Sequence, residues 1–173
     1  MDLLEIIKNR RSIRVFKKQD LPQDIIEKLI EAARWAPSAG NVQPWAFVVA
    51  YSQKIKQNLS MAAFGQEDLE EASVVVVVCA DEKLAEQSYG VRGKSLFCIQ
   101  DTAAAVQNIM LTAYSLGLGS CWIGAFKEDE IRKVIKAPKE MRPVALIPLG
   151  YPNEAPPARN RRPISEVMYN ETF

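Results

Sequence analysis

The sequence predicts one α+β domain over residues 1–173, in which helices and strands mix without a regular strand–helix–strand rhythm. The chain is long enough to bury a sizeable core. Apolar residues make up 48% and charged residues 25%, as in a soluble globular protein. β-branched runs and amphipathic stretches follow each other irregularly, which favours an α+β sheet sandwich over a doubly wound sheet.

The first third of the chain predicts two helices, then a strand and another helix. Residues 2–8 suit a short helix, and residues 21–36 suit a longer one that starts at Pro22, is ended by Pro37 and carries one apolar face. The stretch WAFVVAY at 45–51 predicts a strand, because it is rich in aromatic and β-branched residues. Residues 52–63 predict a helix with a polar face.

The middle of the chain predicts a buried strand and a buried helix. The run ASVVVVVCA at 72–80 is far shorter than the ~20 residues of a membrane helix, so it indicates a strand inside the core. Residues 81–94 are polar and contain two glycines, which predicts a mobile loop or lid. Residues 95–116 form a nearly all-apolar helical stretch, which is expected to be buried on most sides.

The last third predicts a short segment, a surface helix, a strand and an extended tail. CWIGAF at 121–126 is the short segment, KEDEIRKVI at 127–135 the helix and RPVALIPLGY at 142–151 the strand. Residues 152–173 contain four prolines and little periodicity, so they cannot build a core of their own. We expect this tail to lie extended over another surface.

Composition excludes several classes of function. A net charge of +1 argues against nucleic acid as a partner, and no stretch is apolar enough for a membrane span. The amphipathic N-terminus carries acidic residues and does not look like a signal peptide. Three separated cysteines without CxxC spacing favour reduced thiols and a cytoplasmic protein. With no histidine, His-based triads and HExxH zinc sites are excluded.

The stretch RRSIRVF at 10–16 concentrates positive charge just after the first helix. Arg10, Arg11 and Arg14 can donate paired hydrogen bonds to a phosphate, and Ser12 can add a hydroxyl. Cations at the end of a helix also complement its dipole, which is the simpler interpretation of this fragment alone.

Two further stretches of the sequence bear on whether these arginines bind a phosphate or only complement the helix dipole. ARNRRP places Arg159, Arg161 and Arg162 in the tail, where they are either a solvated charge run or, if the tail folds back, the other half of an anion site. APSAGNVQPW at 36–45 offers polar side chains to a heterocycle or a ribityl chain, although such residues are also those of ordinary turns.

Four stretches in order along the chain resemble the FMN-dependent nitroreductase family: RRSIRVF, AARWAPSAGNVQPWAFVV, DTAAAVQNIMLTAYSLGLGSCWIGAF, and ALIPLGYP followed by ARNRRP. The resemblance spans nearly the whole chain. It implies a mainly antiparallel central sheet flanked by helices, and a homodimer that holds one FMN in each of two interface pockets. It also implies that the C-terminal tail extends over the partner subunit.

The resemblance further implies which positions bind the flavin. Those of the first stretch hold the phosphate, ribityl and pyrimidine end, those of the second reach in from the other subunit, and those of the third bring a backbone amide near flavin N5. Two arginines of the tail close on the phosphate. The implied positions are Arg10, Arg11, Ser12, Arg14, Pro37, Ser38, Ala39, Asn41, Gln43, Gln66, Trp122, Ile123, Gly124, Arg159 and Arg161.

The chain departs from the family at one position. Longer members often have Lys near the pyrimidine ring where this chain has Asp68, and Gln66 is expected to serve there instead. Losing a cation near the ring would stabilise anionic reduced flavin less.

By resemblance, the activity is reduction of nitroaromatics, quinones or similar small electron acceptors in alternation with NADH or NADPH. No side chain is expected to act as acid or base, because the flavin carries the chemistry. Two alternatives stay open at the level of sequence. One is a specialised flavin dehydrogenase or dehalogenase of the same fold, and the other is a non-catalytic flavin-binding or redox-sensing dimer.

Overall fold

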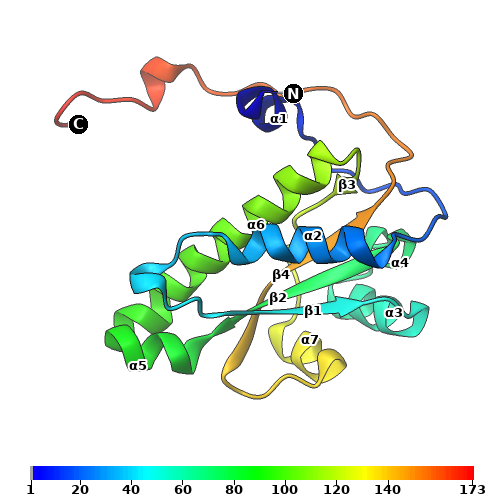
Figure 1. Ribbon diagram of the computed structural model, residues 1–173, viewed down its shortest axis with the longest axis horizontal. Helices are drawn as coiled ribbons and strands as arrows, with labels where there is room; N and C mark the ends of the chain where they lie inside the picture. Colours follow the sequence, from blue (N-terminus) through cyan, green and yellow to red (C-terminus); the bar gives the residue numbers. More distant parts are fainter. Residues whose placement is uncertain (1) are drawn as a thin grey trace.

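The computed structural model describes residues 2–173 and shows a four-stranded sheet with helices on both faces (Figure 1). The strands lie in the order β1-β2-β4-β3, and every pairing between them is antiparallel. The predicted α+β class and antiparallel sheet are therefore confirmed. The strands are β1 (Trp45–Ala50), β2 (Val74–Asp81), β3 (Gly119–Ser120) and β4 (Met141–Gly150).

The helices include all those that the sequence predicted and some that it did not. The α-helices are α1 (Leu3–Asn9), α2 (Gln23–Arg34), α3 (Gln53–Ala62), α4 (Asp68–Glu71), α5 (Glu82–Arg92), α6 (Cys98–Ser115) and α7 (Glu128–Ile135). Three short turns of other helix types are η1 (Ala39–Asn41), η2 (Gly93–Phe97) and η3 (Ile164–Glu166). None of the helices within residues 2–173 combines the length and the apolar character that a membrane crossing requires.

Strand β2 is apolar on both faces, which explains its unbroken run of valines. Val74, Val76 and Val78 pack with residues of α2 and α6 on one face of the sheet. Val75 and Val77 pack with residues of α3 and α7 on the other. Because both faces are covered, neither set of alternate positions meets water, and the polar alternation of a half-exposed strand is absent.

The expectation of a loop over residues 81–94 is wrong, because α5 and the start of η2 occupy this segment. The side chain of Asp81 caps α5 by accepting a hydrogen bond from the backbone N–H of Leu84. The two glycines allow a kink and a close contact. Gly90 has φ 59° and ψ −151°, a conformation open mainly to glycine. A Cβ on Gly93 would lie 2.2 Å from the carbonyl oxygen of Ala85.

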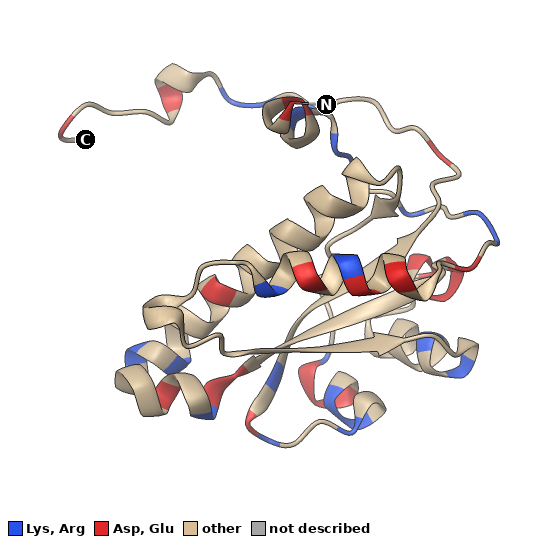
Figure 2. Ribbon diagram, viewed as in Figure 1, with Lys and Arg blue, Asp and Glu red and all other residues tan. Residues whose placement is uncertain are grey.

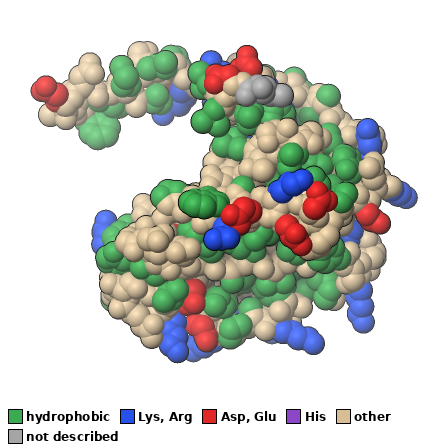
Figure 3. Space-filling model, viewed as in Figure 1, with side chains coloured by type: hydrophobic (Ala, Val, Ile, Leu, Met, Phe, Trp, Pro, Cys, Tyr) green, Lys and Arg blue, Asp and Glu red, His purple; other side chains and the backbone are tan. Residues whose placement is uncertain are grey.

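The C-terminal tail leaves β4 and runs back beside the start of the chain. The backbone N–H of Asn153 donates to the oxygen of Val15, and that of Lys17 donates to the oxygen of Tyr151. Residues 157–173 are exposed throughout. Figure 3 shows the end of the tail as an arm that stands off the body of the molecule, with hydrophobic side chains along it. The extended form that the prolines predicted is therefore present.

Candidate functional site

Arginines from both ends of the chain line one pocket of about 240 Å³. Figure 2 shows the basic stretch of the tail close to the basic stretch that follows α1. The carboxylate of Glu154 holds the tail there by accepting the backbone N–H groups of Arg14 and Val15. The tail thus folds back, and the two clusters meet. The lining residues are Arg10, Arg11, Ser12, Arg14, Pro156, Pro157, Arg159 and Arg161.

No carboxylate neutralises this cluster. Within residues 2–173, none of its five arginines forms an ion pair with an acidic side chain. Arg11 donates to the backbone oxygens of Lys8 and Arg10, and Arg161 to those of Arg159 and Asn160. The cluster therefore carries a positive charge that no direct ion pair within residues 2–173 neutralises.

Arg10 is the arginine of the cluster that has a buried nitrogen, Nη1, without a hydrogen-bond partner in the described chain. Burial lowers the pKa of Arg10; the nearby Cys121 opposes this shift, while Arg161 and Arg11 add to it. A partly buried guanidinium among like charges, with one nitrogen shut off from water and unpaired, is unfavourable unless an anion joins it.

A phosphate group fits this pocket. Its oxygens accept the paired, charge-assisted hydrogen bonds that guanidinium groups donate, and the Ser12 side chain also lines the pocket. The volume of about 240 Å³ holds a phosphate and several waters. The residues present therefore suit the phosphate end of FMN.

Two residues that are close in sequence to predicted positions, Asp68 and Cys121, lie near the arginines. Asp68 and Cys121 are both close enough to Arg14 for its charge to lower their pKa values, although burial raises each of them. Gln66 donates from Nε2 to the backbone oxygens of Ala63 and Ala125, each at 3.0 Å. The side-chain oxygen of Gln66 makes no hydrogen bond within residues 2–173, so it can accept one from a bound group.

The segment Trp122–Gly124 offers fewer free amides than its sequence suggested. The backbone N–H of Ile123 donates to the oxygen of Leu146 at 2.9 Å, and the N–H of Leu146 donates back at 3.0 Å. Trp122 and Gly124 make no such backbone bond in the described chain. An amide that meets a bound ring at this segment must therefore come from Trp122 or Gly124.

The predicted positions Pro37, Ser38, Ala39, Asn41 and Gln43 lie apart from the arginine pocket. The N–H of Ala39 donates to the carboxylate of Asp101 in the first turn of α6. The arginine pocket lies toward the other end of α6, because the neighbouring pocket of about 350 Å³ shares Arg11 and is also lined by Tyr114. From 101 to 114 the helix rises roughly 20 Å at 1.5 Å per residue. One chain alone does not bring these two groups together.

The loop that carries these positions is held by its own contacts. Ser38 Oγ accepts the backbone N–H of Gln43 at 3.0 Å, and Gln43 Nε2 donates to the oxygen of Asn41. Asn41 and Gln43 both have positive φ angles, 57° and 55°. The donors that the sequence suggested for a ligand are thus partly used within the loop.

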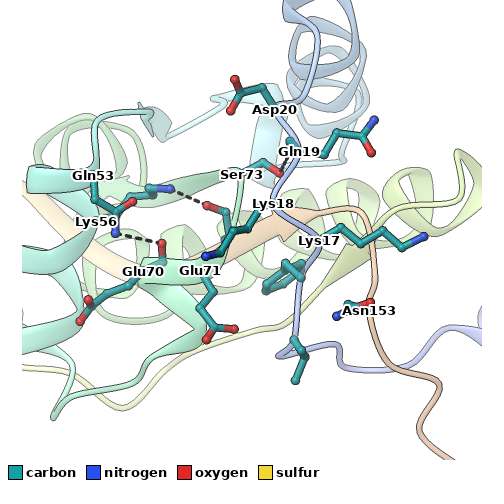
Figure 4. A pocket seen from close by; sticks show the side chains of 13 residues that line it. Lys17, Lys18, Gln19, Asp20, Gln53, Lys56, Glu70, Glu71, Ser73 and Asn153 are labelled. Atoms are coloured by element: carbon teal, nitrogen blue, oxygen red, sulfur yellow. Dashed lines mark hydrogen bonds between the residues drawn. The ribbon is translucent and has the colours of Figure 1, made fainter.

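The largest pocket, about 780 Å³, is a weaker candidate although it is roomier (Figure 4). Its three lysines are matched by three acidic residues, and its buried ammonium group, Lys56 Nζ, donates to the oxygen of Ala72 at 2.6 Å. Gln53 donates to the oxygen of Glu70, and Ser73 to that of Gln19. Three of its polar side chains thus donate to backbone oxygens of the chain, and its positive and negative side chains are equal in number, so the pocket has no net charge comparable to that of the arginines.

Sequence reasoning missed several residues around the site. Pro156 and Pro157 line the arginine pocket and stand just ahead of the arginines of the tail, where two prolines favour an extended chain. Asp101 is a lone carboxylate in an apolar helix, a signal that could have marked it as a backbone anchor. Tyr89 gave no such signal, because its contact with Gly40 exists only in the fold.

Comparisons with known proteins identify the family of the chain. The sequence pattern of the Nitroreductase family matches residues 7–72 and 58–151, which together make up most of the chain. The chain belongs to the nitroreductase family. The resemblance carried by its four stretches is therefore confirmed. The match stops before the arginines of the tail, so the assignment of Arg159 and Arg161 rests on the pocket itself.

Individual relatives within the nitroreductase family cover most of the chain. A protein of Methanothermobacter thermautotrophicus, provisionally named NADH dehydrogenase/NAD(P)H nitroreductase, is 37% identical over 164 residues, which are 92% of this chain and 82% of the relative. A Bacillus subtilis protein named FMN reductase (NADPH) is 30% identical over 183 residues, 98% of this chain and 74% of the relative. The crystal structure of a nitroreductase family protein from Clostridium novyi NT superposes with a TM-score of 0.80 at 36% identity, covering 89% and 87% of the two chains.

Proposed function

We propose that this protein is an FMN-dependent oxidoreductase that uses NADH or NADPH to reduce small electron-poor acceptors such as nitroaromatics or quinones. The observation that carries the proposal is the buried, unpartnered Arg10 Nη1 in a pocket lined by five arginines that form no ion pair within residues 2–173. The names of two relatives support it, since one includes NAD(P)H nitroreductase and the other is FMN reductase (NADPH).

Different residues of the chain hold the phosphate end and the ring end of the cofactor. Arg10, Arg14, Arg159 and Arg161 bind the phosphate, with Ser12 as an additional hydroxyl donor. Gln66 and the free amides of Trp122 or Gly124 meet the ring end. When bound, FMN supplies the two-electron chemistry that side chains alone do not. We assign no side chain as acid or base.

We also propose that two copies of the chain complete each site. The group from Pro37 to Gln43 lies roughly 20 Å from the arginine pocket along α6, so a second copy must supply it to the same cofactor. Helix α1 has no buried residue, and the arm of the tail exposes Ile164 and Tyr169. Apolar surface of this extent on a small protein favours a partner chain.

The test of the activity is anaerobic reduction of the FMN-loaded protein. We expect NADH or NADPH to bleach the flavin absorbance, and a nitroaromatic or a quinone to restore it with two electrons per flavin. Retained FMN that neither nicotinamide reduces would contradict the proposed enzyme and favour the redox-sensing alternative.

A further inference from the structure

Asp68 is a buried carboxylate at the edge of the cationic site. It begins α4 and is only 7% exposed. Its Oδ2 atom is buried without a hydrogen-bond partner in the described chain. Burial raises the pKa of Asp68, and the charge of Arg14 opposes that rise more than any other neighbour does. An acid that folding has removed from water, yet left unpaired, calls for an explanation beyond packing.

Two other acidic residues near the cluster, Glu154 and Glu71, differ from Asp68 because both are exposed. Glu154 is exposed, and one of its carboxylate oxygens accepts backbone N–H groups of the segment after α1. Glu71, which also acts on Asp68, is exposed and lines the large pocket instead. Asp68 is thus the buried carboxylate whose field reaches the arginines.

Asp68 influences the arginines without neutralising one of them. The distance from its oxygens to the Arg14 guanidinium exceeds the 4.0 Å of an ion pair, since no such pair forms within residues 2–173. Asp68 is itself shielded from water, and a buried charge acts over several ångströms with less screening than a charge on the surface. The carboxylate therefore weakens the positive potential that the arginines create for a bound anion.

We propose that Asp68 lowers the reduction potential of the bound flavin, so that it holds oxidised FMN more firmly relative to reduced FMN than the arginines alone would. This inference rests on the proposed function and names a tuning residue within that site. Reduction adds negative charge to the cofactor; the arginines favour that charge and a neighbouring carboxylate disfavours it.

The test compares Asp68→Asn with Glu67→Gln, an equal loss of charge at the adjacent, exposed residue. The potential of bound FMN is measured by dye equilibration at pH 8, together with the affinity for oxidised FMN. We expect Asp68→Asn to raise the ratio of the affinities for reduced and oxidised FMN about tenfold, which is about 30 mV for two electrons. Glu67→Gln is expected to change this ratio of affinities less than twofold.

Two further variants keep the test decisive. Asp68→Glu keeps the charge and is expected to keep the potential, whereas Asp68→Ser removes the charge and serves if Asp68→Asn does not fold. An unchanged potential after loss of the charge would overturn the inference, as would an equal shift in Glu67→Gln or in Asp68→Glu. Failure of the unaltered protein to bind FMN is a different result, which refutes the proposed function itself.

Discussion

At the scale of single residues, the atoms left without partners point to the site. Four buried side-chain atoms within residues 2–173 lack a hydrogen-bond partner, and two of them, Arg10 Nη1 and Asp68 Oδ2, lie around the arginine cluster. One is a donor and the other an acceptor. Native proteins leave few such atoms, and each unmet group costs about 1–3 kcal/mol. A ligand with both phosphate oxygens and N–H or O–H groups could satisfy both.

Gly40 allows a prediction about the loop that carries the other group of site positions. It has φ +53°, and a Cβ there would lie 2.1 Å from the hydroxyl oxygen of Tyr89. Gly65 has φ +78° with open space around it. Each alanine substitution is expected to destabilise by about 1 kcal/mol through the backbone, and Gly40→Ala by about 1 kcal/mol more because Tyr89 must move.

Urea denaturation of Gly40→Ala and Gly65→Ala measures this difference in the free energy of unfolding. A Tyr89→Phe background removes the hydroxyl and should reduce the difference in unfolding free energy between the two alanine variants. Equal losses in the two alanine variants would show that Tyr89 moves aside without penalty and does not hold the loop.

The residues of the site differ in how far the sequence could predict them. The arginines were predictable as candidates, because clustered charge is visible in the sequence. The residues alone left their pairing open, and only the family resemblance implied it, because it depends on hydrogen bonds that bring Glu154 and Asn153 beside the segment after α1. The role of Ile123 was also hidden, since its amide is used by a bridge to Leu146, 23 residues further along.

At the scale of secondary structure, periodicity predicted the elements that carry the core and failed where glycine was ambiguous. The valine run became β2, and the long apolar stretch became α6. Glycines at 90 and 93 indicated a loop, yet they allow a kink in α5 and a close approach of two helical turns. The short helix α4 was missed as well, because its four residues, DLEE, show no period.

At the scale of the whole molecule, the two groups of site positions lie at opposite ends of α6, which predicts assembly. We expect sedimentation velocity of the FMN-loaded protein at micromolar concentration to give twice the 19.4 kDa mass of one chain. The exposed arm of the tail and helix α1 provide apolar surface for such an interface. A monomer that retains one FMN per chain would refute a site shared between subunits.

The proposed function depends above all on the arginine pocket holding the phosphate of FMN. The most direct measurement compares the affinities of the apo-protein for FMN and for riboflavin, which lacks the phosphate. Hydrogen bonds to a charged group contribute about 1.5–3 kcal/mol each, so two of them favour FMN by about 100-fold or more. We expect Arg10→Ala to reduce this preference at least tenfold while changing riboflavin affinity little.

Arg34→Ala is the matched control, because this exposed arginine of α2 pairs with Glu31 and does not line the pocket. It should keep the full preference for FMN. Equal binding of riboflavin and FMN by the unaltered protein would contradict the account, as would an Arg10→Ala variant that loses both ligands to the same extent.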